Sequence, residues 1–154
     1  MKGFRSLTLW LFMLLAACSS AGKTRLQAYF QAVAPYEQLL GEVQTELTRI
    51  AGLHQSERRQ AYEQMALGLE ERAAQLKQLE VPREAARYHT GLSELLELGR
   101  AFMRNAASAI DADQETTARL ASERQALSER WSSGVTLLKA EQAALAQKHG
   151  LQFE

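Results

Sequence analysis

Apolar side chains recur at spacings of three, four or seven residues along four stretches of this 154-residue sequence. An α-helix has 3.6 residues per turn, so each set falls on one helical face. The first set is Leu26, Phe30, Val33, Leu40, Val43, Leu47 and Ile50. The second is Tyr62, Met65, Leu69, Leu76 and Leu79. The third is Leu92, Leu95, Leu96, Phe102, Met103, Ala106 and Ile110. The fourth is Leu120, Leu127, Trp131, Val135, Leu138 and Leu145.

Short breaks separate the four sets and predict where the helices begin and end. Ser56 is the expected N-cap of the second helix, Pro82 suits the first turn of the third, and Asp113 precedes the fourth. Gly150 is the expected stop of the last helix. The predicted helices are 24–52, 56–79, 83–110 and 114–148. Short connections favour antiparallel neighbours, so residues 24–154 are predicted to form one all-α domain, a four-helix up-down bundle.

The segment before the bundle has the organisation of a secretory signal. Lys2 and Arg5 give it a basic start, and an apolar stretch runs from Leu7 to Ala17. This stretch is shorter than the ~20 apolar residues that span a bilayer as a helix. It ends at Cys18, the single cysteine of the chain.

The run Leu15-Ala16-Ala17-Cys18 resembles the lipobox of bacterial lipoproteins. The resemblance implies a lipoprotein signal peptide at residues 1–17, cleavage between Ala17 and Cys18, and acylation of Cys18 with chains such as palmitate. Residues 18–23 would then be a lipidated cysteine with a short tether, and two or more acyl chains would hold the protein durably in the lipid bilayer. The alternative is an ordinary secreted protein with a lone thiol near its signal.

The residue after the cysteine bears on localisation. In lipoproteins of Gram-negative bacteria, aspartate at that position commonly marks retention in the inner membrane. Ser19 stands there in this chain. By resemblance, a lipid-anchored protein at the outer membrane is therefore favoured if the source is Gram-negative.

Charge gives no reason to expect nucleic acid as a partner. The whole chain has 18 basic and 18 acidic residues. Residues 1–17 contain two basic and no acidic residues, so their removal leaves a formal charge of −2. With one cysteine, no disulfide can form within the chain.

No pattern typical of catalysis or of metal binding stands out. Di-iron bundles use Glu-x-x-His, but the residue three places before each of His54, His89 and His149 is alanine. There is no Gly-x-Ser-x-Gly sequence and no phosphate-binding glycine loop. We therefore expect no enzymatic activity, no cofactor and no metal site.

Aromatic residues and a histidine are predicted to gather at the end of the bundle that lies nearest the membrane. These residues are Tyr29, Phe30, Tyr36, Tyr88 and His89. Two interpretations are open for this cluster. One is a pocket for haem, a metal or a small apolar molecule, and the other is a structural cluster, with tyrosine rings packed and hydroxyls near water. The second interpretation is favoured.

A broader resemblance covers about the last eighty residues. Leu76-x-x-Leu79-x-x-Pro82 is followed by His89 and by a helix that ends near Ile110-Asp111. This arrangement is similar to that of uncharacterised all-helical bacterial envelope lipoproteins. The sequence thus predicts a membrane-anchored cell-envelope lipoprotein, a non-enzymatic interaction or accessory module with an envelope protein as partner. The alternative is a ligand-binding helical bundle.

Overall fold

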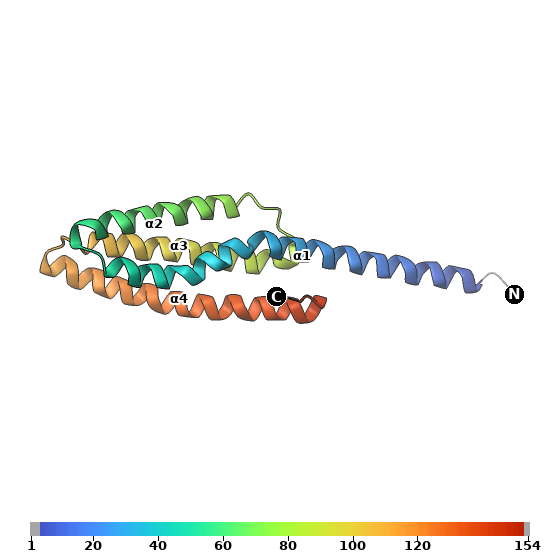
Figure 1. Cartoon of the computed structure of the whole chain (residues 1–154). Helices are drawn as coiled ribbons and strands as arrows, with labels where there is room; N and C mark the ends of the chain where they lie inside the picture. Colours follow the sequence, from blue (N-terminus) through green and yellow to red (C-terminus); the bar gives the residue numbers. More distant parts are fainter. Residues whose placement is uncertain (1–3, 153–154) are drawn as a thin grey trace.

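Four helices pack side by side in this protein, and each runs opposite to the one before it (Figure 1). The computed structural model describes the backbone of residues 4–152 and the side chains of residues 22–152. Its elements are α1 (Phe4–Ala51), α2 (Gln55–Leu76), the 3₁₀ turn η1 (Arg83–Ala85), α3 (Ala86–Ser108) and α4 (Gln114–His149). The predicted all-α four-helix fold is confirmed.

The helix ends differ from the prediction at several places, and α3 begins at Ala86 rather than at residue 83, because residues 83–85 form the 3₁₀ turn. Helix α1 begins at Phe4, so its backbone is helical through the predicted tether, residues 18–23, which contains no proline. Helix α2 ends at Leu76. The amides of Gln78 and Leu79 donate to carbonyls three residues earlier, which tightens the last turn. Pro82 then disfavours a helical conformation at Val81, the residue before it. Ser56 is not the N-cap of α2. His54 holds that position, and its side chain makes no capping hydrogen bond.

The ends of α4 agree with the sequence. The carboxylate of Asp113 accepts a hydrogen bond from the Thr116 amide at 2.8 Å, which satisfies a free donor of the first turn. At the other end, Gly150 has φ 61° and the Leu151 amide donates to the Ala146 carbonyl at 3.0 Å. This left-handed stop requires the conformational freedom of glycine.

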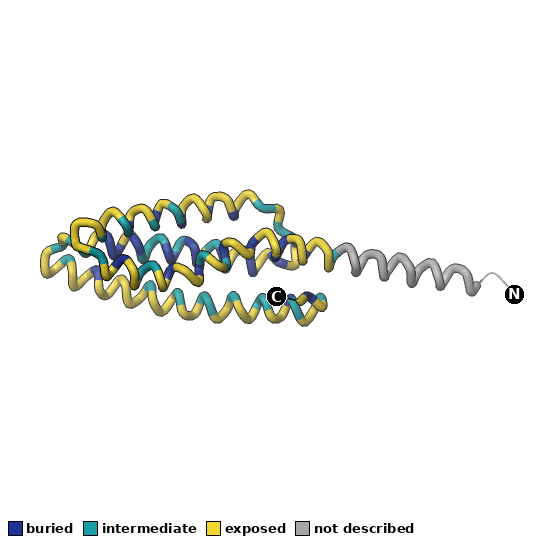
Figure 2. The backbone as a smooth tube through the Cα atoms, viewed as in Figure 1, coloured by how far each residue is buried: buried dark blue, intermediate teal, exposed yellow. Residues whose placement is uncertain are grey.

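Helix α3 lies at the centre of the bundle and contacts α1, α2 and α4. Figure 2 shows its buried residues between the more exposed outer helices. Helix α4 lies at the periphery. Only Leu120 and Leu145 are buried among its 36 residues. The core is therefore formed mainly by α1, α2 and α3, and α4 covers one side of α3.

Most of the predicted apolar sets form the core. Six residues of the first set are buried, and so are Leu69, Leu76, Leu92, Leu95 and Leu96. Other members pack against the core while remaining partly exposed. They are Leu47, Met65, Leu79, Ile110, Leu127, Trp131, Val135 and Leu138. Phe102 is also only partly buried.

Two interior glycines allow the helices to approach closely. A Cβ on Gly134 of α4 would lie 2.9 Å from a methyl carbon of Leu95 on α3. A Cβ on Gly99 of α3 would lie 3.4 Å from both Leu69 and Trp131. Gly134 thus serves as a contact point between α3 and α4, while Pro35 lies within α1 without ending it.

Candidate functional site

The predicted lipidation site belongs to the amino-terminal part of α1. Ala17 and Cys18 lie outside the residues whose side chains the structure describes. Cleavage and acylation there remain predictions from the sequence. From residue 22 to residue 152, no helix is long and apolar enough to cross a membrane.

The predicted aromatic cluster forms between α1 and α3. The ring of Tyr29 lies 5.5 Å from Phe30 and 6.5 Å from Tyr88, and Phe30 lies 5.0 Å from Tyr88. All three pairs are edge-to-face, the arrangement that the ring quadrupoles favour. The Tyr29 hydroxyl is 3.2 Å from Nδ1 of His89. Tyr36 is buried in the same core, two helical turns further along α1.

A glutamate that the sequence did not single out completes this region. Glu37 of α1 accepts a hydrogen bond from the Tyr88 hydroxyl and another from Nε2 of Gln142 at 3.3 Å. One carboxylate therefore joins α1, α3 and α4. A glutamate at the edge of an apolar helical face has no distinctive sequence signal, because most such residues point into solvent.

Burial sets the protonation states of the cluster. It raises the pKa of Tyr29 and of Tyr88 above the usual range, and the negative charge of Glu37 acts in the same direction. Burial also lowers the pKa of His89. The neutral imidazole is thus favoured, and it can accept a hydrogen bond from Tyr29 at Nδ1.

A cavity of about 460 Å³ lies beside His89, between α3, α4 and Lys77, the residue that follows α2. Charged side chains of both signs line it, including Lys77, Glu97 and Arg100. Among residues 22–152, no group of three or more histidine, cysteine, aspartate or glutamate side chains could hold a metal ion. His89 thus has a tyrosine hydroxyl as its near neighbour, and no second metal ligand is placed beside it by the described residues.

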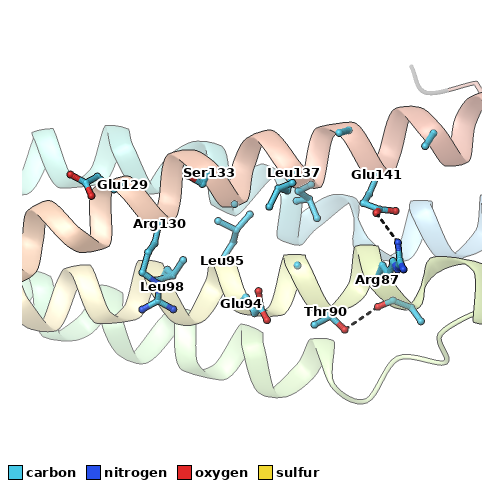
Figure 3. Close-up of a pocket in the computed structure, with 16 residues that line it drawn as sticks. Arg87, Thr90, Glu94, Leu95, Leu98, Glu129, Arg130, Ser133, Leu137 and Glu141 are labelled. Carbon is cyan, nitrogen blue, oxygen red and sulfur yellow. Dashed lines mark hydrogen bonds and ion pairs between the residues drawn. The ribbon is translucent and has the colours of Figure 1, made fainter.

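A larger depression runs between α3 and α4, and sequence reasoning missed it. We call it the α3/α4 groove, a space of about 980 Å³. Figure 3 shows its two walls, one from each helix. The α3 wall consists of Ala86, Arg87, Thr90, Gly91, Glu94, Leu95 and Leu98. The α4 wall consists of Glu129, Arg130, Ser133, Gly134, Leu137, Leu138, Ala140, Glu141 and Ala144.

The groove has charged ends, and between them leucines lie beside one acidic residue, Glu94 of α3 (Figure 3). Leu137 lies in the middle and is 67% exposed, which is unusual for a large apolar residue among residues 22–152. At one end, Arg87 of α3 lies 3.9 Å from Glu141 of α4 (Figure 3). At the other end lie Glu129 and Arg130. A surface of this kind is suited to contact with another protein.

A second polar contact missed from the sequence joins α3 to the start of α4. Asn105 is buried, with 7% of its surface exposed. Its side-chain amide donates to the Leu120 carbonyl at 3.0 Å, and its oxygen accepts from Nε of Arg124 at 3.1 Å. The sequence does contain a sign of this burial, because Asn105 lies between Met103 and Ala106, two members of a predicted apolar set. Its role is structural, because all of its hydrogen-bond partners, Glu123 included, belong to the protein itself.

Comparison of the chain with protein-family models, with curated proteins and with solved structures gave no match.

Proposed function

We propose that this protein is a membrane-anchored cell-envelope lipoprotein, and that its helical bundle acts as a non-enzymatic interaction module. The observation that carries the proposal is Cys18 at the end of the apolar segment, preceded by Leu15-Ala16-Ala17. Acylation would attach the bundle to a bilayer through Cys18. The α3/α4 groove, with its exposed leucine and charged ends, supports a role in protein contact.

The N-terminus of the native protein tests the anchor. Mass spectrometry should find a chain that lacks residues 1–17 and begins with an acylated Cys18. Cys18→Ser should leave the chain unprocessed or release it from the membrane fraction. Ser19→Ala is the matched control, because it changes the next residue without removing the thiol. An unmodified Cys18 at the N-terminus of the processed native protein would refute this part of the proposal.

The localisation part of the proposal depends on Ser19. In a Gram-negative source we expect the lipoprotein in the outer membrane, and Ser19→Asp should shift it toward the inner membrane. Separation of the two membranes by density, followed by detection of the protein in each, measures this shift. The same distribution for both forms would refute the localisation and leave the anchor untouched.

One observation favours a second candidate, a bundle that binds haem, a metal or a small apolar molecule. His89 borders the cavity of about 460 Å³, and its ring is partly accessible. The absorption spectrum and metal content of the native protein distinguish the two functions. A Soret band, or stoichiometric metal that is lost in His89→Ala, would establish the ligand-binding function.

A further inference from the structure

Basic residues gather at the end of the bundle from which α1 continues toward Cys18. At this end, α1 leaves the bundle beside the last turn of α4 and the connection between α2 and α3 (Figure 1). Nζ of Lys23 lies 3.8 Å from the position that a Cβ on Gly150 would occupy, so this part of α1 and the end of α4 lie together. The basic residues here are Lys23, Arg25, Arg83 and Lys148. We call this set the basic end.

Acidic residues are scarce in the same region. Residues 23–36 of α1 contain no aspartate or glutamate, and neither do residues 142–152, which include the last turns of α4. Glu80 and Glu84 lie in the connection between α2 and α3. These two carboxylates reduce the positive charge of the basic end without cancelling it. The nearly balanced charge of the whole chain therefore hides an uneven distribution.

The four basic side chains are available to a partner. All four residues are exposed, and none of their side chains forms an ion pair with another described side chain. Ion pairs are common elsewhere in the bundle. Arg49 lies 2.7 Å from Glu46, for example, and Arg104 lies 2.7 Å from Glu70. The basic end thus presents positive charge that the protein does not neutralise, which favours an anionic partner.

The position of Cys18 determines which anionic partner is near. Helix α1 is continuous from Cys18 to Lys23, and a helix rises ~1.5 Å per residue, so these two residues are ~7.5 Å apart along the axis. Charges are screened over about 8 Å at physiological ionic strength. Acylation of Cys18 would therefore hold the basic end within about one screening length of the phospholipid headgroups. A large anionic partner would have to enter the narrow space between the bundle and the bilayer.

We propose that the basic end binds the anionic phospholipid headgroups of the membrane in which Cys18 is anchored. The end of the bundle then rests on the bilayer surface, and the opposite end, where α1 ends and α4 begins, points away from it. A lysine or arginine near an anionic bilayer strengthens binding about fivefold. Several such contacts suffice, because the anchor already holds the two surfaces together. The inference rests on the anchor of the proposed function and adds a second contact with the membrane.

The experiment uses the native processed protein, reconstituted in vesicles of phosphatidylcholine alone or of an equal mixture of phosphatidylcholine and phosphatidylglycerol. A dye on Gln152→Cys measures fluorescence energy transfer to an acceptor on the lipid headgroups. The same dye on Ser56→Cys, an exposed position at the start of α2, measures transfer from the opposite end. An acylated Cys18 has no free thiol, so each variant is labelled at one position.

We expect greater transfer from residue 152 in the anionic vesicles than in the neutral ones. Transfer from residue 56 should be lower and should differ less between the two kinds of vesicle. At 1 M salt the screening length falls to about 3 Å, so the difference for residue 152 should disappear.

Charge reversal identifies the residues that make the contact. Lys23→Glu, Arg25→Glu and Lys148→Glu together should reduce transfer in the anionic vesicles to the value in neutral vesicles. The matched control reverses three basic residues that are also exposed and outside any described ion pair but lie along α2 and α4, namely Arg72→Glu, Arg130→Glu and Lys139→Glu. It changes the net charge equally and should leave the transfer unchanged. Circular dichroism confirms that both proteins are folded.

Equal transfer from residue 152 in the two kinds of vesicle would overturn the proposal, and so would an equal effect of the two triple variants. Mass spectrometry of the same sample reports acylation separately. An acylated protein with no preference for anionic vesicles would refute the headgroup contact and leave the anchor intact. An unacylated native protein that floats with anionic vesicles and not with neutral ones would refute the anchor and retain the headgroup contact.

Discussion

Gly134 provides the sharpest test of the packing between α3 and α4. In Gly134→Ala, the new Cβ would lie 2.9 Å from one methyl carbon of Leu95 and 3.5 Å from its Cγ. Leu95 is 1% exposed and cannot move into solvent. Overpacking of a core typically costs ~1–3 kcal/mol, while replacing glycine by alanine within a helix gains ~1 kcal/mol. We expect a free energy of unfolding that is unchanged or lower by up to ~2 kcal/mol.

Gly68 of α2 is the matched control. A Cβ at this position would have no neighbouring atom within 4 Å. Gly68→Ala should therefore show only the helix-propensity gain, about 0.5–1 kcal/mol of added stability. The two alanine variants should differ by ~1–3 kcal/mol, although their chemical change is the same.

Urea unfolding followed by far-ultraviolet circular dichroism measures both variants against the parent chain, with equal m-values as the condition for comparison. A double-mutant cycle with Leu95→Ala identifies the contact. In the Leu95→Ala background the opposing methyl groups are gone, so Gly134→Ala should become stabilising by about 1 kcal/mol. If Gly134→Ala stabilises the parent as much as Gly68→Ala does, α3 and α4 do not approach each other as described.

Three further predictions concern the core, the buried amide and the histidine. Leu96→Ala should lower the free energy of unfolding by ~2–5 kcal/mol in urea titrations, because Leu96 is fully buried. Asn105→Ala should cost ~1–3 kcal/mol, because it leaves the Leu120 carbonyl without its side-chain donor, and a melting temperature equal to the parent's would contradict this role. For His89, burial lowers the pKa below 6.5, so the unfolded chain binds a proton more readily than the folded chain. The part of the stability that depends on His89 should be constant above about pH 6.5 and should fall as the pH drops below that value. His89→Ala should make the free energy of unfolding less dependent on pH in this range. Near neutral pH it should change that free energy by about 1 kcal/mol or less.

The helices and most of the core could be predicted because they depend on local sequence. Apolar spacing marks the buried faces of α1 and α3, and Asp113 and Gly150 mark the ends of α4 through contacts within a few residues. The contact between Tyr29 and His89 could also be predicted from the sequence, because short connections determine which helix ends lie together. The boundary at Ser56 was wrong. Several polar residues lie near that break, and the sequence does not show which of them ends the turn.

The groove, the role of Glu37 and the uneven burial of α4 could not be predicted in the same way. Each depends on how far two helices approach and on how they are rotated about their axes. The set containing Leu120 and Leu145 has the same spacing as that of α3, yet the other residues of this set remain partly exposed. Spacing identifies the inward side of a helix but not how many neighbours cover that side.

The central position of α3 affects the order in which this chain can fold as it is made. Helix α3 is third in the sequence, and α2 makes most of its contacts with it, while α1 and α2 contact each other far less. Helix α2 therefore emerges before the surface on which most of it packs. Leu69 and Val43, for example, both face Gly99, which is synthesised later than either. Until α3 is available, these apolar faces remain accessible to chaperones or to other chains.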